Sequence, residues 1–124
     1  MPQVKIHIPS DIEDESKRKL VQVVRELIPT ILNIDEKIGQ VMLYESRHRA
    51  THLSRDNNFV FIEITMYIGR SFELKEKLAD TLIAEVQKYT NVGRNDINLV
   101  YYELTPENYF GGTTHKYIED LRIV

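Results

Sequence analysis

A weak internal repeat is the feature that most constrains how this chain can fold. When the sequence is shifted by 58 residues, identical residues coincide at Ile6 and Ile64, Glu15 and Glu73, Lys17 and Lys75, Lys19-Leu20 and Lys77-Leu78, Asn33 and Asn91, and Tyr44-Glu45 and Tyr102-Glu103. Their shared order indicates two copies of one unit. Two copies are too few for a solenoid. We therefore expect one domain over residues 1–124, with units at about 2–46 and 59–104 and a C-terminal arm over about 108–124.

Each unit has the pattern of a strand, a helix and a second strand. Residues 4–8 alternate between apolar and polar, residues 20–31 carry an apolar stripe at helical spacing, and residues 41–44 are again typical of a strand. The second unit repeats this order with a strand over 60–68, a helix over 74–86 and a strand over 97–104. A strand, a helix and a parallel strand connect by a right-handed crossover. The predicted fold class is α+β, a four-stranded mixed sheet with two helices on one face.

The expected helix boundaries rest on capping residues. We expect Ser10 or Asp11 to cap the first helix, Pro29 to kink it or end it early, and Asn33 to be its C-cap. The equivalent boundaries of the second helix are Ser71 and residues 91–93.

The sheet face opposite the helices is too apolar for a free surface and too polar for a core. The residues expected on it are Gln3, Lys5, His7, Phe59, Phe61, Glu63, Thr65, Tyr67, Tyr101 and Glu103. Association of subunits would cover this face. The arm also ends in apolar residues, which suggests that it reaches a neighbouring subunit.

Composition narrows the class of protein further. The chain has 124 residues, a formal net charge of −3 and no cysteine, which excludes disulfides and thiolate zinc sites. Without a basic excess, nucleic-acid binding is not expected. No apolar run approaches the roughly 20 residues of a membrane span, and the first residues lack the apolar segment of a signal peptide. We expect a soluble, cytoplasmic protein that binds no nucleic acid and no membrane.

Pro2 is the first candidate for chemistry. Loss of Met1 is favoured before a small residue and would leave a secondary amine at the tip of the first strand. An α-amino group has a pKa of about 8, and modest desolvation or a nearby cation brings that pKa close to neutrality. Such a group can take up and return protons. A proline at position 2 is also common and usually inert, so both interpretations stay open.

Arg70 is the second candidate. It follows Gly69 at a predicted strand-to-helix turn, where backbone N–H groups and the helix dipole attract anions. Its guanidinium can hold a carboxylate through two hydrogen bonds. The alternative is a surface arginine paired with Glu73.

Further cationic groups lie in the loop over residues 45–58, namely Arg47, His48, Arg49, His52 and Arg55. They would line an anion pocket or steer acidic substrates, or they simply belong to a solvated loop. Two histidines without a third ligand do not make a metal site, and none is predicted. Tyr109, just before a Gly-Gly pair, would wall a pocket or merely pack.

Three segments resemble the tautomerase superfamily: MPQVKIHIP, FVFIEITMYIGRSFELKEKLADTLIAEV and INLVYYELTPENYFGG. The second half is similar to one 4-oxalocrotonate tautomerase unit. The whole chain is similar to 5-carboxymethyl-2-hydroxymuconate isomerase and, more distantly, to macrophage migration inhibitory factor. This resemblance implies a homotrimer whose sheets surround a channel, and proton transfer on small keto–enol carboxylates without metal or cofactor.

The resemblance also implies roles for individual residues. Pro2 would be the proton shuttle, Arg70 the cation that binds the carboxylate or stabilises the enolate, and Tyr109 part of an apolar wall. Where short tautomerases place a second arginine, this chain has Asn98, and Gln40 in the first unit. Asn33 takes the place of a lysine found in the inhibitory-factor branch. The residues expected to bind substrate are therefore Asn98, Tyr109, Arg47 and Arg49, with Arg55 as another stand-in for the missing cation.

Three functions stay open at this point. The first is a tautomerase or isomerase with Pro2 as general base. The second is a hydratase, dehalogenase or decarboxylase of a small acid, in which the proline acts as an acid. The third is a non-catalytic trimeric binding protein that keeps the fold, because fold alone does not decide function.

Overall fold

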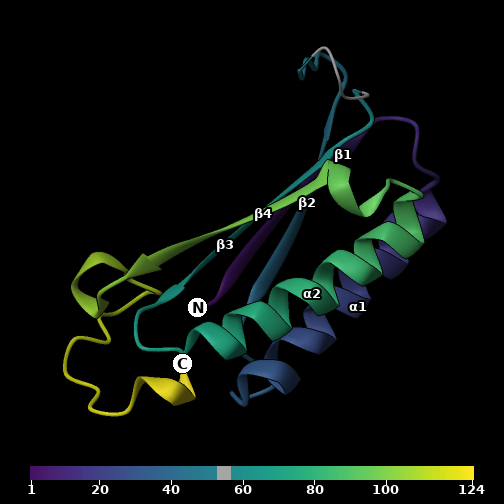
Figure 1. Cartoon of the computed structure of the whole chain (residues 1–124). Coiled ribbons are helices and arrows are strands. Elements are labelled where there is room, and N and C mark those ends of the chain that lie inside the picture. Colours follow the sequence, from purple (N-terminus) through teal and green to yellow (C-terminus); the bar gives the residue numbers. More distant parts are fainter. Residues whose placement is uncertain (53–56) are drawn as a thin grey trace.

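The computed structural model describes residues 1–52 and 57–124. The chain forms β1 (Gln3–Pro9), α1 (Asp14–Leu32), β2 (Gln40–Ser46), β3 (Val60–Tyr67), α2 (Phe72–Thr90) and β4 (Ile97–Leu104), with short 3₁₀ helices η1 (Arg94–Asp96), η2 (Pro106–Asn108) and η3 (Leu121–Ile123). Both long helices lie against one face of the sheet (Figure 1). The predicted α+β architecture is confirmed.

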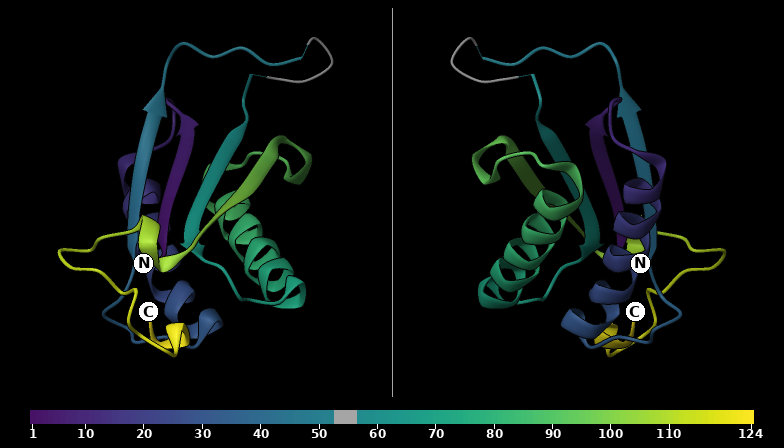
Figure 2. Two further views of the ribbon diagram at one scale, coloured as in Figure 1. Left: turned by 90° about the vertical axis from the view of Figure 1, so that its left-hand side faces the viewer. Right: turned by 90° about the vertical axis from the view of Figure 1, so that its right-hand side faces the viewer.

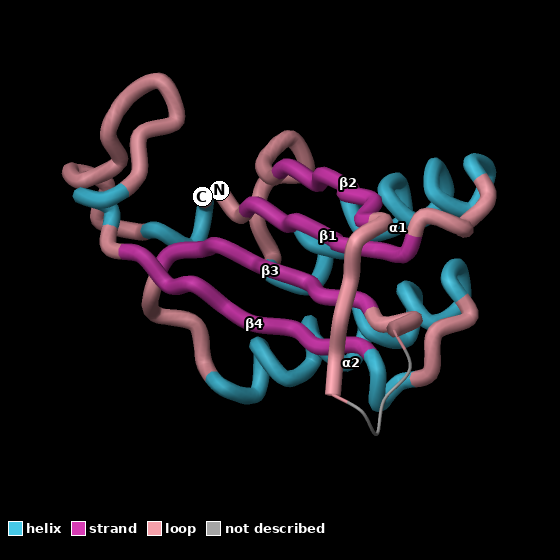
Figure 3. Tube along the Cα trace, turned by 90° about the horizontal axis from the view of Figure 1, so that it is seen from above, coloured by secondary structure: helices cyan, strands magenta, loops and turns pink. Residues whose placement is uncertain are grey.

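The strand order is β2-β1-β3-β4, as the view onto the sheet shows (Figure 3). The two outer pairs, β1 with β2 and β3 with β4, are parallel, and the central pair of β1 and β3 is antiparallel. The beginnings of β1 and β2 therefore lie at the same end of the sheet as the ends of β3 and β4. We call this end of the strands the N-terminal edge, because Pro2 lies there.

The internal repeat is visible in the details of the fold. Both helices have 19 residues and start 58 positions apart, and each ends at an asparagine with left-handed backbone, Asn33 at φ 55° and Asn91 at φ 59°. An ion pair between the helix and the closing strand also recurs, as Lys17–Glu45 in the first unit and Lys75–Glu103 in the second. Both C-cap predictions are confirmed.

The core lies between the sheet and the helices. Inward residues of β1 and β3 alternate with residues of the other face, and those turned toward the helices are fully buried, among them Ile6, Ile62 and Ile64. They pack with the helix residues Leu20 and Leu78, which are also inaccessible to solvent. Each such side chain contributes about 1.5–3 kcal/mol relative to an exposed one.

The first helix begins later than we expected, and it does not end early at Pro29. Its N-cap is Glu13, not Ser10 or Asp11, and no side chain caps it. Those two residues belong to the turn after β1, so the helix begins only when the chain has turned back toward the sheet. Pro29 does not end the helix, which continues to Leu32. A proline this close to the C-terminus removes only one hydrogen bond of the last turns.

Tyr101 and Glu103 lie on the helix face, not on the open face where we expected them. In the parallel register of β3 and β4 they are paired with Ile64 and Met66, which point into the core. The Tyr101 hydroxyl donates to the Lys75 carbonyl of α2 at 2.6 Å, so a long polar side chain reaches over the core. The alternation in β4 starts from buried Ile97, which turns the tyrosine inward.

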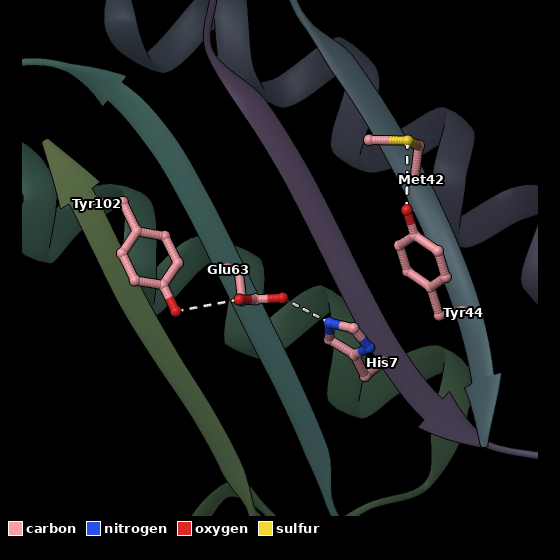
Figure 4. A network of polar contacts seen from close by, with 5 residues as sticks. All are labelled: His7, Met42, Tyr44, Glu63 and Tyr102. Atoms are coloured by element: carbon pink, nitrogen blue, oxygen red, sulfur yellow. Dashed lines mark hydrogen bonds and ion pairs between the residues drawn. The ribbon is translucent and has the colours of Figure 1, made fainter. Parts of the chain in front are cut away.

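The open face carries a polar network among aromatic side chains (Figure 4). His7 and Glu63 are 2.6 Å apart (Nε2 to Oε2), and the Tyr102 hydroxyl donates to Glu63 at 3.0 Å. The His7 ring stacks on Tyr44 and on Phe61. The two hydrogen bonds stabilise the ionised carboxylate of Glu63 and so lower its pKa. The bond with His7 has the larger effect and the bond with Tyr102 the smaller one.

The C-terminal segment from residue 109 onward folds back against its own chain. It leaves β4 at the N-terminal edge and returns past it, so that the two termini lie near one another in all views (Figures 1–3). His115 of this segment bonds to Tyr67 at the end of β3, 2.7 Å away.

Candidate active site

The sheet topology brings Pro2, Arg70 and Tyr109 to the same edge. Pro2 precedes β1, Arg70 follows β3, and Tyr109 lies beyond the end of β4. Because β1 runs antiparallel to β3 and β4, the chain start meets the ends of those strands. Three of the predicted site residues thus converge on the N-terminal edge.

Arg70 is held at the turn between β3 and α2. Gly69 in this turn has φ +111°, a conformation that side chains rarely adopt, and Ser71 caps α2 by accepting from the Leu74 N–H at 3.2 Å. The guanidinium makes one long contact, from Nη1 to the Tyr67 carbonyl at 3.5 Å. Its Nη2 is buried and has no hydrogen-bond partner among the described residues. Burial lowers the pKa of Arg70, and the negative charge of Glu103 offsets only part of this shift.

The chain terminus lies next to this guanidinium. Met1 and Pro2 are both buried, and the Pro2 carbonyl accepts from the Gln40 N–H at 3.1 Å. Burial, and then the positive charge of Arg70, lower the pKa of the Met1 amino group below its usual value. With Met1 attached, the Pro2 nitrogen is an amide and has no basic lone pair. The structure therefore places the Met1 amino group, with its lowered pKa, beside a guanidinium whose Nη2 has no hydrogen-bond partner among the described residues.

A cavity of about 470 Å³ opens at Arg70. Its walls come from the end of α1 with Leu32 and Asn33, from the turn with Arg70, and from the C-terminal segment with Asp120 and Arg122. This volume is within the ordinary range of about 300–1,000 Å³ for small-ligand sites. Asn33, the C-cap of α1, also borders the cavity.

An aromatic group lies beside Arg70 on the other face of the sheet. Tyr67 is fully buried, its ring meets those of Tyr109 and His115 edge-on, and its hydroxyl is 2.7 Å from His115 Nδ1. Burial, with a smaller contribution from Tyr109, raises the pKa of Tyr67, so the hydroxyl keeps its proton in this contact. Sequence reasoning gave Tyr67 and His115 no role at the site, and it missed Arg122, because a fold-back of the C-terminal segment leaves no periodic signal.

The other predicted site residues lie at the opposite edge of this chain. Asn98 is paired with Phe61 at the start of β4, and Arg47 and Arg49 follow the end of β2. Arg49 bonds to the Ser46 hydroxyl at 2.8 Å and to two backbone carbonyls, and its guanidinium covers the Phe59 ring. Arg49 thereby links the end of β2 to the residues that precede β3. Within one chain these three residues do not meet Pro2, and Arg55 lies outside the described residues.

Neither a cluster of metal ligands nor a helix able to span a membrane is found among residues 1–52 and 57–124. No group of three His, Asp or Glu side chains there is arranged to hold a metal ion. None of the helices in those residues is long and apolar enough to cross a membrane.

The family follows from comparison with known sequences. A family model described as "Tautomerase enzyme" matches residues 40–111, more than half of the chain. The chain belongs to this family, and so to the tautomerase superfamily. No curated protein matches the sequence.

Solved structures share the fold over nearly the whole chain. Pt0534 inactivated by 2-oxo-3-pentynoate has a TM-score of 0.87 at 16% identity, covering 95% of this chain and 99% of that one. A macrophage migration inhibitory factor-like protein from Entamoeba histolytica has 0.78 at 18%, covering 91% and 97%. A fused 4-OT wild-type symmetric trimer has 0.78 at 15%, covering 86% and 89%. At these identities the likeness is one of fold.

Proposed function

We propose that this chain is a cofactor-independent tautomerase that moves a proton on a small keto–enol carboxylate. Pro2, freed by removal of Met1, is the general base in this proposal, and Arg70 is the cation that holds the carboxylate. The observation that carries it is the position of the chain terminus beside Arg70, whose buried Nη2 has no partner in the described residues. A buried guanidinium nitrogen that lacks a hydrogen-bond partner is well suited to donate to an anion.

The electrostatics suit this chemistry. Burial and the positive charge of Arg70 lower the pKa of the Met1 amino group, and in this proposal the Pro2 nitrogen becomes the amine beside the same guanidinium once Met1 is removed. An amine with a pKa near neutrality is unprotonated in part at physiological pH, so it can abstract a proton from the enol hydroxyl or the α-carbon. In the reaction, the proline takes that proton and returns it to a different carbon. Arg70 stabilises the negative charge that develops on oxygen meanwhile.

A covalent probe tests the role of Pro2. The structural relative Pt0534 was inactivated by 2-oxo-3-pentynoate, an acid whose alkyne is attacked by a basic amine: a C–N bond forms, and the proton ends on the alkyne carbon. We expect one adduct per chain on the Pro2 nitrogen of protein that lacks Met1, located by peptide mass. An adduct only on lysine or histidine side chains would contradict the proposal.

A second candidate is a binding protein of the same fold without proton transfer. The burial of Met1, 8% exposed, favours it, because the methionine packs as part of the structure. Intact mass of untagged protein separates the two. Retained Met1 supports the binding protein, whereas loss of Met1 together with turnover of phenylpyruvate enol or 2-hydroxymuconate supports the tautomerase. Malonate semialdehyde belongs in the same assay, because a decarboxylase of that compound shares the fold.

We further propose a homotrimer assembled through the open face. That face exposes Met42, Tyr44 and Tyr102 around the His7–Glu63 pair, and two of the structural relatives are symmetric trimers. Met42→Glu adds a charge to this surface on the outer strand β2. Sedimentation should show trimers for the wild type and monomers for the variant, and an unchanged trimer would exclude the open face as the contact.

A further inference from the structure

A buried tyrosine attaches the C-terminal segment, residues 109–124, to the sheet. The Tyr67 hydroxyl at the end of β3 lies 2.7 Å from His115 Nδ1, and Tyr67 is inaccessible to solvent. The backbone N–H groups of Lys116, Arg122 and Val124 bond within the segment, whereas the bond between Tyr67 and His115 joins it to the sheet across 48 positions of the sequence. This bond is therefore a tertiary contact and not part of the local fold of the segment.

The rings around this bond form an aromatic cluster of Tyr67, Tyr109 and His115. The Tyr67 ring meets the Tyr109 ring at 80° and the His115 ring at 72°, with centroids 6.1 and 5.9 Å apart. Edge-to-face contacts are favourable because the positive edge of one ring points to the negative face of the other. Gly111 lies beside the Tyr109 ring, where a Cβ atom would come within 3.2 Å of it. Two positions of the segment are thus held against the end of β3.

The rest of the segment is loosely packed. None of residues 109–124 is fully buried, and Phe110, Tyr117 and Ile123 are 68%, 82% and 57% exposed. A hollow of about 180 Å³ lies between the turn before α2 and the last residues of the segment. A segment with so few buried contacts opens at a low cost in free energy. The bond between Tyr67 and His115 therefore has a large share in keeping it closed.

The position of the segment matters because the segment borders the cavity at Arg70. Asp120, Arg122 and Ile123 form part of the wall of the cavity of about 470 Å³. Tyr67 contacts Arg70 as well, since its main-chain carbonyl accepts from Nη1 at 3.5 Å. Opening of the segment would remove this wall and admit water to Arg70, and water weakens the attraction between a guanidinium and a carboxylate.

We propose that the hydrogen bond between Tyr67 and His115 is a latch that keeps the C-terminal segment closed over the cavity at Arg70. Tyr67 and His115 are positioning residues in this inference, and the carboxylate itself is bound by Arg70. The inference rests on the proposed function in using the same cavity and the same cation, but it requires no proton transfer. The closed segment favours binding of a small carboxylate, and the open segment weakens it.

Hydrogen exchange tests the latch without any ligand. Tyr67→Phe removes only the hydroxyl, and His115→Leu removes its partner. In both variants the amides of Lys116 and Ile118, which are hydrogen-bonded within the segment, should exchange at least fivefold faster than in the wild type, and the amides of α2 should be unchanged. His115→Asn should restore the wild-type rates, because asparagine has a polar atom at the position of Nδ1 that bonds to a hydroxyl.

Binding of a carboxylate tests what the latch does for the cavity. The probe is 3-phenylpropionate, which has the ring and the carboxylate of phenylpyruvate but no keto group to react. We expect calorimetry to show an affinity at least fivefold lower for Tyr67→Phe and His115→Leu than for the wild type. The affinity of His115→Asn should stay within twofold of the wild type. His115 lies in a surface segment, so its two variants keep the comparison valid even if Tyr67→Phe unfolds.

Tyr101→Phe is the matched control. It also deletes a tyrosine hydroxyl with a short hydrogen bond, 2.6 Å to the Lys75 carbonyl, but on the helix face of β4. This variant should leave the exchange of the segment and the affinity for 3-phenylpropionate within twofold of the wild type. An equal effect of Tyr101→Phe would reduce the latch to a general loss of stability and overturn it.

The outcomes separate the inference from the proposed function. Unchanged exchange of the segment in Tyr67→Phe and His115→Leu overturns the latch. Faster exchange with unchanged affinity, or a wild type that does not bind 3-phenylpropionate, overturns the part of the latch in binding. The full pattern in a protein without tautomerase activity leaves the inference standing and overturns the proton-transfer function alone.

Discussion

Replacing Arg70 by glutamine separates a functional arginine from a structural one. In the described structure the guanidinium gives the fold one long contact, 3.5 Å to the Tyr67 carbonyl, while its buried Nη2 bonds to nothing. Its removal therefore deletes a partly desolvated charge and little else. We expect the free energy of unfolding to change by less than about 1 kcal/mol, with either sign.

Catalysis should respond very differently to the same substitution. A bound carboxylate loses two charge-assisted hydrogen bonds at roughly 1.5 kcal/mol or more each, about 3 kcal/mol together. That corresponds to about a 100-fold loss of kcat/KM. Because the proposed mechanism has Arg70 bind the carboxylate in both the ground state and the transition state, KM should rise and kcat should fall.

The assay combines initial rates of enol ketonisation, followed by ultraviolet absorbance, with urea unfolding of the same samples. Arg94→Gln, at the opposite edge of the sheet, should change neither kcat/KM nor stability by more than surface pairs usually do, about 1 kcal/mol or less. The reasoning fails if Arg70→Gln lowers the free energy of unfolding by several kcal/mol, or if its kcat/KM stays within threefold of the wild type.

Three further predictions follow from single groups. In protein that retains Met1, the Met1 amino group should titrate below its usual pKa of about 8 in an NMR experiment, and Arg70→Gln should raise that pKa. Because the amine of the unfolded chain keeps its proton to a higher pH than the folded one, this group makes stability rise with pH between the folded and the unfolded pKa. Ser71→Ala should lower the free energy of unfolding by about 1 kcal/mol, because the side chain that caps α2 is lost. Glu13 makes no cap bond in α1, so Glu13→Ala should lower it clearly less, and equal losses would argue against the cap. Burial raises the pKa of Tyr101 to about 12, so a spectrophotometric titration of Tyr101→Phe should lack the last tyrosine step seen in the wild type. Because the folded state holds this proton more tightly than the unfolded chain, the contribution to the free energy of unfolding is complete below about pH 10 and is lost as the pH rises toward 12.

The elements of the fold were accessible to sequence reasoning because their signals are local. Alternation over β3, the capping serine before α2 and the paired asparagines at positions 33 and 91 each depend on neighbours along the chain. The errors arose where a tertiary contact decides. The start of α1 depends on the turn after β1, and the inward orientation of Tyr101 depends on the register of β4 against β3.

The candidate site was accessible only in part, for the same reason. Pro2 and Arg70 carry local signals, the first as a chain terminus and the second as part of a strand-to-helix turn. Arg122 and His115 have no periodicity, and their place depends on how residues 109–124 return over the N-terminal edge. Asn98 carries no charge and lies at the far edge in this chain, so its part in substrate binding stays a prediction.

The most direct test is the ketonisation rate of untagged protein whose intact mass shows the loss of one methionine, measured beside Pro2→Ala. If a free imino nitrogen next to Arg70 removes the proton, the wild type turns over the enol and the variant is slower by at least tenfold. Equal rates for the two proteins, or the same rate from wild-type protein that still carries Met1, would contradict the account.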